Sequence, residues 1–171
     1  MAIIPSLKKD QVDQIAKEVY ERFEKQTGKV PEWVKVMAHN SRILKEFTEL
    51  FKVIMGKGEI EDLLKWKIAF VVSDSLKCPF CVDVTIKTLK SLGATDKIID
   101  EVKKGEVSNE DEREMLSLVK EVTLKAQVCT PELLTELKKD FSEKEIIEIV
   151  SIIGLFNYIN RFNNTLCILP E

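Results

Sequence analysis

The spacing of apolar residues constrains the fold of this chain more than any other feature. Near the N-terminus, Val12, Ile15, Val19 and Phe23 recur at intervals of three or four residues, which is the period of one face of an α-helix. Most later segments show the same period, and none alternates in the manner of a half-buried strand. The apolar run at 68–72 fits a strand by itself, but the periodic residues on both sides of it favour a helix. We therefore predict an all-α protein.

Prolines, glycines and capping residues divide this pattern into separate helices. The 171 residues include only 6 glycines and 5 prolines, and most of these fall where a periodic segment stops. We predict one domain over residues 1–171, in which residues 1–30 form an N-terminal helical arm. The expected helices run from Asp10 to Gly28, from Pro31 to about Met37, from Ser41 to Gly56, from Glu59 to Lys77, from Cys78 to about Leu92, from Thr95 to about Val102, from Ser108 to about Val128, from Thr130 onward and from Ser142 onward.

The charge pattern gives no reason to expect nucleic acid or a membrane as a partner. The net charge is −3, and lysines and acidic residues are interleaved without a basic block. No segment approaches the roughly 18 uninterrupted apolar residues of a membrane span, and the first residues lack the pattern of a secretory signal. We expect a cytoplasmic protein, and in that reducing compartment a Cys-x-x-Cys motif is more often catalytic or metal-binding than a structural disulfide.

Cys78 and Cys81 form such a motif where a helix is predicted to begin. Pro79 suits the first helical position, so Cys78 is the expected N-cap. The free N–H groups and the positive dipole end of a helix N-terminus stabilise a thiolate, which is the reactive form of cysteine. A spacing of three places both sulfur atoms on one helix face, within reach of a disulfide. The pattern favours a redox pair, and the capping argument makes Cys78 the more acidic thiol.

Two other interpretations of the pair stay open. A zinc site needs four ligands, and the remaining candidates, His39, Cys129 and Cys167, lack the paired spacing of a zinc motif. We therefore expect no metal. The pair could also be two small core residues, because free cysteine packs as an apolar side chain. A thioredoxin-like fold is disfavoured, since the residues before the motif are mostly helical and no strand leads into it.

Three separated segments resemble one protein family in order and spacing. They are LKCPFCVDVTIKTLKSLGATDKIIDEV, VPEWVKVMAHNSRILKEFTELFKVIM and IVSIIGLFNYINRFNNTLCILPE, and together they span roughly residues 30–171. They resemble the alkylhydroperoxidase D-like, or carboxymuconolactone decarboxylase, superfamily, and within it the peroxidase-related branch. The resemblance implies an all-helical fold with the Cys-x-x-Cys motif at a helix N-terminus, and assembly into a homo-oligomer.

The same resemblance implies a thiol-dependent peroxidase or disulfide reductase that uses no cofactor. By the family pattern, Cys81 attacks a peroxide or disulfide substrate and Cys78 resolves the product to a disulfide. A dithiol reductant, such as a lipoyl group, then restores both thiols. The family pattern thus names Cys81 as the attacking thiol, whereas the capping argument favours Cys78 as the more acidic one.

The chain departs from the family pattern at two titratable positions. Thr85 stands where the family has a histidine, and Trp66 stands where it has the glutamate that begins a proton relay. Neither side chain is a base near neutral pH, and general-base help is commonly worth about 10²–10⁴ in rate. We therefore predict slow peroxide turnover, with exchange between the dithiol and disulfides still available. Asp74 is a further candidate support, although a solvated surface charge is the simpler interpretation.

Two alternatives to a thiol oxidoreductase remain. The chain could be a non-catalytic oligomeric protein that kept the scaffold, or, less favoured, a lactone decarboxylase. Among other residues, His39 is expected in a turn or cap, and Trp33 and Trp66 are expected in the core or an interface. Cys129 and Cys167 are expected to be inert apolar residues. Several polar residues of the apolar C-terminal segment would need partners if buried: Asn157, Asn160, Arg161, Asn163 and Asn164.

Overall fold

A computed structural model describes residues 3–125 and 131–170, and every regular element in these ranges is a helix. This confirms the predicted all-α class. Short 3-10 helices span Lys9–Gln11 and Ala38–Asn40. The α-helices are α1 (Gln14–Thr27), α2 (Glu32–Met37), α3 (Ser41–Met55), α4 (Asp62–Ser75), α5 (Pro79–Ser91), α6 (Asp96–Lys104), α7 (Glu110–Leu124), α8 (Pro131–Asp140) and α9 (Glu143–Thr165). No helix in the described ranges is long and apolar enough to cross a membrane.

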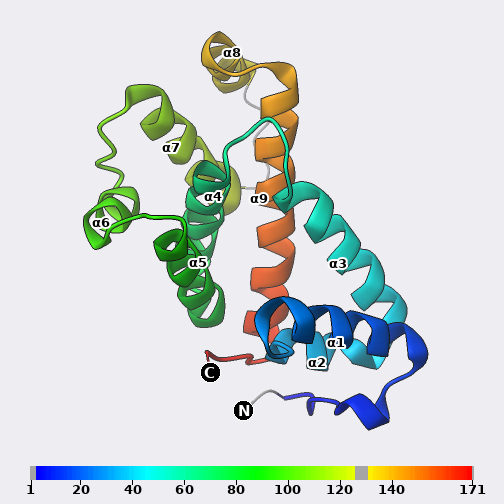
Figure 1. The fold of residues 1–171 in the computed structure, drawn as a ribbon. Helices are drawn as coiled ribbons and strands as arrows, with labels where there is room; N and C mark the ends of the chain where they lie inside the picture. Colours follow the sequence, from blue (N-terminus) through cyan, green and yellow to red (C-terminus); the bar gives the residue numbers. More distant parts are fainter. Residues whose placement is uncertain (1–2, 126–130, 171) are drawn as a thin grey trace.

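The helices are arranged around α4 and α9. α4 packs against α5, α7 and α9, while α3 lies along the other side of α9 and carries α1 and α2 (Figure 1). α4 is buried almost all round, including Ile68, Ala69, Phe70, Val71 and Val72. A helix surrounded by other helices needs apolar residues on every side. This environment explains why residues 68–72 by themselves fitted a strand.

Several predicted helix boundaries are confirmed. The side chains of Thr95 and Ser142 accept hydrogen bonds from the first turns of α6 and α9, and Ser142 forms a capping box with Glu145. Gly28 and Gly105 end α1 and α6 in the left-handed conformation. A glycine adopts this conformation without the steric cost that a Cβ atom imposes.

Other predicted starts are wrong by one to four residues. α1 begins at Gln14 with Asp13 as its cap, because Asp10 belongs to a separate 3-10 turn that ends at an extended residue. α3 is capped by Asn40, and Ser41 lies inside the helix, where its hydroxyl donates to Asp13 Oδ2 at 2.6 Å. Asn40, which is adjacent to the expected cap Ser41, accepts the same bond equally well.

The boundaries near α7 differ in the same way. Asn109 caps this helix in place of Ser108, and its Oδ1 accepts from the backbone N–H of Glu112 at 2.8 Å. The helix ends at Leu124 rather than near Val128. The predicted start at Thr130 and the position of Cys129 lie outside the described residues.

A buried ion pair joins α4 to α9. Lys65 is completely buried and pairs with the carboxylate of Glu148. Its Nζ also donates to the carbonyl oxygens of Ile54 and Gly56, at 3.2 and 2.5 Å, where α3 ends. Glu148 Oε2 accepts from the two backbone N–H groups of residues 59–60, at 2.8 and 3.0 Å. These bonds compensate the cost of burying two charges and hold the 56–61 loop against α9.

Candidate active site

The two cysteines lie at the turn between α4 and α5. After α4 ends, Lys77 adopts a left-handed conformation with φ 52°, and the backbone N–H of Cys78 donates to the carbonyl of Ser73 at 3.2 Å. Cys78 is the N-cap of α5 and Pro79 occupies its first turn, both as predicted. Asn164 of α9 donates to the carbonyl of Leu76 at 3.0 Å, which ties this turn to the C-terminal helix.

The two sulfur atoms face each other inside the protein. Their Sγ atoms are 3.0 Å apart and share a hydrogen bond, and both residues are free cysteines. Cys78 is 0% exposed and Cys81 is 5% exposed. Both belong to a small apolar cluster with Val36, Phe80 and Ile168. The pair is therefore buried but correctly placed to exchange a proton or to form a bond between its sulfurs.

The hydrogen bonds around the pair shift the pKa values of the two thiols in opposite directions. The S–H of Cys81 donates to Cys78 and lowers the pKa of the Cys78 thiol; burial acts in the opposite direction, and the backbone N–H groups of Cys81 and Phe80 lower that pKa further. The backbone bond from Cys81 is 3.4 Å long. The same sulfur–sulfur bond raises the pKa of Cys81, as do burial and the nearby charge of Cys78. The pair thus favours a thiolate at Cys78 and a proton on Cys81.

Asn163 of α9 is the polar side chain that opposes the shift at Cys81. Its Nδ2 donates to Cys81 Sγ at 3.2 Å, and this bond lowers the pKa of Cys81. Asn163 is 0% exposed. The sequence indicates that this asparagine needs a partner if it is buried, but not that it lies beside the cysteines. Its contact depends on the packing of α9 against α5, which no local pattern reveals.

A cavity of about 490 Å³ opens beside Cys81. It lies between α1, α3, α4, α5 and α9, and Cys81 and Asn163 are part of its wall whereas Cys78 is not. Aromatic side chains from all these helices and from α2 line it: Phe23, Trp33, Phe51, Trp66, Phe80 and Phe156. Of the two cysteines, Cys81 is therefore the one that a molecule in the cavity meets.

Of the three predicted supporting residues, Thr85 contacts the backbone of Cys81, and Trp66 lies in the wall of the same cavity. Trp66 lines the cavity and contacts Phe156 edge to face, with ring centroids 5.9 Å apart. Thr85 is buried, and its hydroxyl bonds to the carbonyl of Cys81 at 2.9 Å and to that of Val82 at 3.0 Å. Its only hydroxyl hydrogen is thus used on the backbone and does not serve the sulfur.

Asp74, the third predicted support, lies elsewhere. Its Oδ2 pairs with Lys77 Nζ at 3.2 Å, and the residue borders a different pocket between α4, α6 and α7. The helical turn that carries Asp74 directs it away from the cavity that Cys81 borders. The interpretation of Asp74 as a surface charge therefore fits its position better than a role beside the thiols.

The other polar residues take structural positions. His39 lies in the short 3-10 helix Ala38–Asn40, and its Nε2 bonds to the carbonyl of Pro5 in the N-terminal segment at 2.8 Å. Arg161 bonds to Asn157 on its own helix. Cys167, expected to be an inert apolar residue, is exposed. Within the described ranges, no group of three His, Cys, Asp or Glu side chains gathers where a metal ion could bind.

Comparison with known proteins supports the fold. No family model matches the chain. It is 23% identical over 125 residues to the uncharacterized protein YnjA of Escherichia coli K12, covering 67% of this chain and 69% of YnjA. Its structure is similar to that of an uncharacterized peroxidase-related protein from Ralstonia eutropha JMP134 with an alkylhydroperoxidase AhpD core, with a TM-score of 0.89, 18% identity and coverage of 99% and 92%.

The fold is also that of a dehalogenating enzyme. The structure of the debrominase Bmp8 matches with a TM-score of 0.83 and 25% identity, covering 99% of this chain and 92% of Bmp8. A cysteine-to-alanine variant of Bmp8 has been solved in complex with 2,3,4-tribromopyrrole. These likenesses and the position of the Cys-x-x-Cys motif agree with the fold expected from the sequence. The chain has the all-helical AhpD-like fold of the peroxidase-related proteins.

Proposed function

We propose that this protein is a dithiol oxidoreductase that reduces an organic peroxide or disulfide at Cys81 and resolves the product with Cys78. The observation that carries the proposal is the different position of the two cysteines. Cys81 borders a cavity large enough for a small organic molecule, and Cys78 lies behind it at a helix N-terminus. The resemblance to the peroxidase-related branch and the AhpD-like fold support the same assignment.

The pair itself supplies the proton transfer for which the family pattern uses glutamate and histidine. Cys78 as thiolate accepts the proton of Cys81 across their 3.0 Å contact, which leaves Cys81 as the nucleophile. The Cys81 sulfur attacks the terminal oxygen of the hydroperoxide, the O–O bond breaks, and Cys81 becomes a sulfenic acid. The departing alkoxide takes the proton back from Cys78 and leaves as an alcohol.

The second step forms the disulfide. The Cys78 thiolate attacks the sulfur of the Cys81 sulfenic acid, the S–S bond forms and hydroxide leaves. The substrate has then gained two electrons and the pair has lost two. A dithiol reductant returns them by thiol–disulfide exchange, which forms its own disulfide and restores both cysteines. A disulfide substrate follows the same route, with a thiolate as leaving group.

Reductive dehalogenation is a second candidate, which the aromatic lining of the cavity favours. Six aromatic side chains line it, and flat apolar rings pack well against such walls. The similar fold of a debrominase that binds a brominated pyrrole makes this chemistry worth testing. The Cys81 thiolate would take bromine from a ring carbon as that carbon gains a proton. Cys78 would then displace bromide and form the disulfide.

The experiment that tests the proposal follows the two thiols by mass spectrometry of peptides. Addition of tert-butyl hydroperoxide should join Cys78 to Cys81 by a disulfide, and dihydrolipoamide should reverse it. Cys78→Ser should accumulate a sulfenic acid at Cys81 that dimedone traps, and Cys81→Ser should consume no peroxide. If both native thiols stay reduced in the presence of hydroperoxide, 2,2′-dithiodipyridine and tribromopyrrole, the alternative of a non-catalytic scaffold replaces this proposal.

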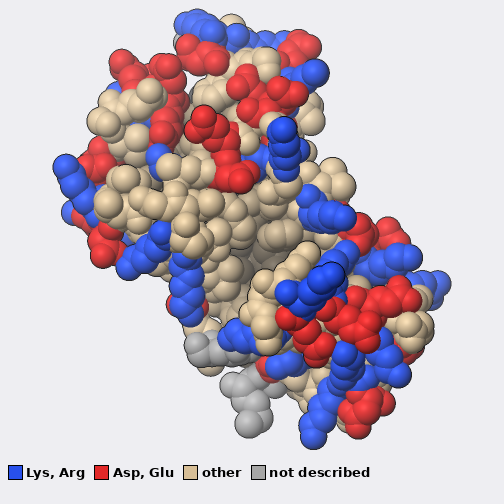
Figure 2. Space-filling model, viewed as in Figure 1, with Lys and Arg blue, Asp and Glu red and all other residues tan. Residues whose placement is uncertain are grey.

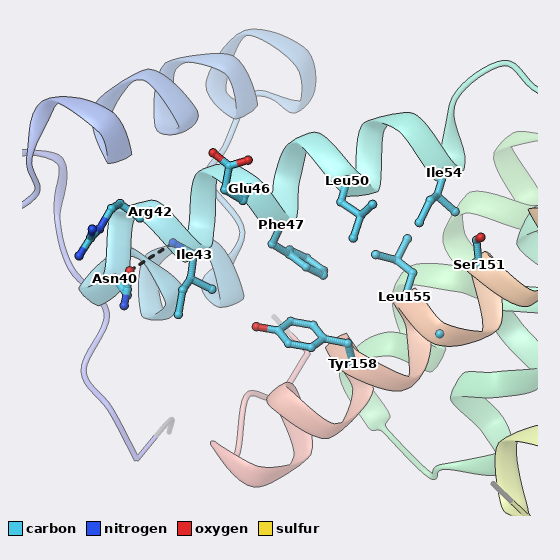
Figure 3. A pocket seen from close by; sticks show the side chains of 11 residues that line it. Asn40, Arg42, Ile43, Glu46, Phe47, Leu50, Ile54, Ser151, Leu155 and Tyr158 are labelled. Atoms are coloured by element: carbon cyan, nitrogen blue, oxygen red, sulfur yellow. Dashed lines mark hydrogen bonds between the residues drawn. The ribbon is translucent and has the colours of Figure 1, made fainter. Parts of the chain in front are cut away.

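We also propose that the protein forms a homo-oligomer through the face shared by α3 and α9. A groove of about 920 Å³ runs between these helices, and Figure 3 shows Leu50, Leu155 and Tyr158 directed toward it. Three exposed apolar side chains of these helices line the groove: Ile43, Leu50 and Tyr158. On the face drawn in Figure 2, charged side chains of both signs gather toward the two ends of the molecule, and the middle is largely without Lys, Arg, Asp or Glu. Clustered apolar side chains of this kind mark interaction surfaces.

A second copy of the chain is the occupant that fits this face. Arg42 and Glu46 lie one helical turn apart at the same end of the groove (Figure 3). A twofold arrangement presents the same patch from both copies. It can therefore set the arginine of each copy against the glutamate of the other while the apolar side chains pack between them.

A further inference from the structure

We propose that Asn163 is a catalytic residue that activates Cys81 with its amide N–H and positions the O–H end of a hydroperoxide with its amide oxygen. This inference rests on the proposed function, because it assigns the group that stabilises the Cys81 thiolate and orients the substrate in that reaction. The substrate class it implies is a molecule that carries a hydrogen-bond donor at the atom attacked by sulfur.

The first half of the proposal concerns the bond to sulfur. Asn163 Nδ2 lies 3.2 Å from Cys81 Sγ, and the two residues come from different helices, α9 and α5. Within the described residues, Asn163 and Cys78 are the side chains that hydrogen-bond to this sulfur. Cys78 accepts the proton of Cys81, and the negative charge that Cys81 gains on deprotonation, before it attacks, is met by the amide N–H of Asn163. A fixed donor aimed at developing charge is an effective form of electrostatic stabilisation.

The second half concerns the oxygen of the same amide. Asn163 is 0% exposed, it forms part of the cavity wall, and its Oδ1 has no hydrogen-bond partner within the described residues. A buried acceptor without a partner is costly and rare in proteins. A ligand with an O–H group next to Cys81 would satisfy it.

A hydroperoxide presents that group on the correct atom. The oxygen that the sulfur attacks is the one that carries the hydrogen. An acceptor beside Cys81 therefore holds this oxygen against the sulfur while the alkyl part lies among the aromatic side chains. A disulfide lacks a donor at its reacting sulfur and gains nothing from Oδ1, so the two substrate classes should respond differently to a change at this residue.

Asn160 provides a matched control on the same helix. It lies one turn before Asn163, is also 0% exposed, and also has an Oδ1 without a partner in the described part of the chain. Its Nδ2, however, donates to Ser73 Oγ at 3.2 Å and to the carbonyl of Phe156 at 2.6 Å, and it does not border the cavity. Replacement of Asn160 removes an equally buried amide without changing the environment of the sulfur.

The test compares Asn163→Leu with Asn160→Leu in two assays. The first measures alkylation of Cys81 by iodoacetamide against pH, read by mass spectrometry. For Asn163→Leu we expect the profile to move to higher pH and the rate at pH 7 to fall about 10- to 100-fold, the range for a lost hydrogen bond to a charged group. Asn160→Leu should leave both unchanged. Equal profiles for the two variants would overturn the proposal.

The second assay compares oxidation of the pair by tert-butyl hydroperoxide and by 2,2′-dithiodipyridine. Asn163→Leu should slow the hydroperoxide reaction more than the disulfide reaction, and an equal loss for both would show that Oδ1 does not hold the O–H group. If the leucine variant fails to fold, judged by circular dichroism, Asn163→Ala answers the same questions. The alkylation result stands even if the wild-type protein consumes no peroxide, so failure of the proposed function is seen separately.

Discussion

Cys81 Sγ lies 3.0 Å from Cys78 Sγ, yet only Cys81 borders the cavity. The sulfur that reaches a ligand is thus the one that holds the proton, and the sulfur that favours the thiolate lies behind it. This arrangement reconciles the two sequence arguments that disagreed. Helix capping makes Cys78 the more acidic thiol, whereas the family pattern makes Cys81 the thiol that attacks the substrate.

The first prediction is that the two thiols titrate far apart. Because the Cys81 hydrogen bond and the α5 N–H groups lower the pKa of Cys78, one thiolate should form below about pH 8.5, the value for free cysteine. The raised pKa of Cys81 should keep its proton well above that pH. Absorbance at 240 nm against pH measures both steps, in a variant with Cys167→Ser and Cys129→Ser so that other thiols do not contribute.

Replacement of either cysteine should remove the pKa shift that it causes in the other. Cys81→Ala deletes the donor to Cys78, so the pKa of Cys78 should rise. Cys78→Ala deletes the acceptor and the charge beside Cys81, so the pKa of Cys81 should fall toward its ordinary value, assisted by Asn163. If both single variants titrated as in the intact pair, the two sulfurs would not share a proton.

The second prediction is that Thr85 does not have the catalytic role that the histidine has in the family pattern. Its hydroxyl bonds to the carbonyls of Cys81 and Val82, so Thr85→Val should cost about 1 kcal/mol of stability, as for one ordinary hydrogen bond. The rate of Cys81 alkylation should not change, because no bond to sulfur is lost. Urea unfolding and peptide mass spectrometry give the two values. A large fall in the alkylation rate with unchanged stability would instead make Thr85 part of the chemistry.

The third prediction concerns the buried pair of Lys65 and Glu148. Lys65→Met should destabilise the fold by about 3–5 kcal/mol, because it leaves a carboxylate in a largely buried site without its cation. The double variant Lys65→Met/Glu148→Leu should recover part of this loss, since no charge then remains unpaired. Urea unfolding of the single and double variants measures both effects. If the double variant were no more stable than Lys65→Met, the unpaired carboxylate of Glu148 would not be the cause of the loss.

The ion pair of Lys65 and Glu148 should also make the free energy of unfolding depend on pH. Burial acts to raise the pKa of Glu148, but the bonds from Lys65, Ile60 and Glu59 outweigh it, and the pKa is lowered. A carboxyl with a lowered pKa in the folded state contributes its full stabilisation above its unfolded pKa, about 4.3. That contribution is lost as the pH falls through the folded value. The free energy of unfolding should therefore fall below about pH 4 more steeply in the wild type than in the double variant.

Local patterns were sufficient to predict the all-α class and the start of α5. Cys78 followed by Pro79 defines a helix N-terminus through contacts within one turn, so the N-cap could be read directly from the sequence. Thr95 and Ser142 are confirmed for the same reason. Asn40 and Asn109 were missed because two adjacent residues can each cap a helix, and tertiary contacts such as that of Ser41 with Asp13 decide between them.

The cavity and Asn163 could not be predicted in this way. Trp33 and Trp66 were expected in the core or at an interface, and the structure places both in the cavity wall beside the cysteine pair. Asn163 reaches Cys81 across 82 positions of sequence. Such contacts depend on how α9 crosses α5. Apolar helices can pack at several crossing angles, so the apolar pattern of α9 does not specify this one uniquely.

The last prediction tests the face that α3 and α9 share. Leu50 is 52% exposed and lines the groove, so a charge placed there would be buried without a partner in any assembly that uses this face. Leu50→Glu should therefore shift the protein to monomers in size-exclusion chromatography with light scattering, without loss of helical circular dichroism. Leu124 is similarly exposed, at 57%, but lies at the end of α7 away from the groove. Leu124→Glu should keep the wild-type assembly, and a monomeric wild-type protein would remove the basis for assigning this face to a second copy.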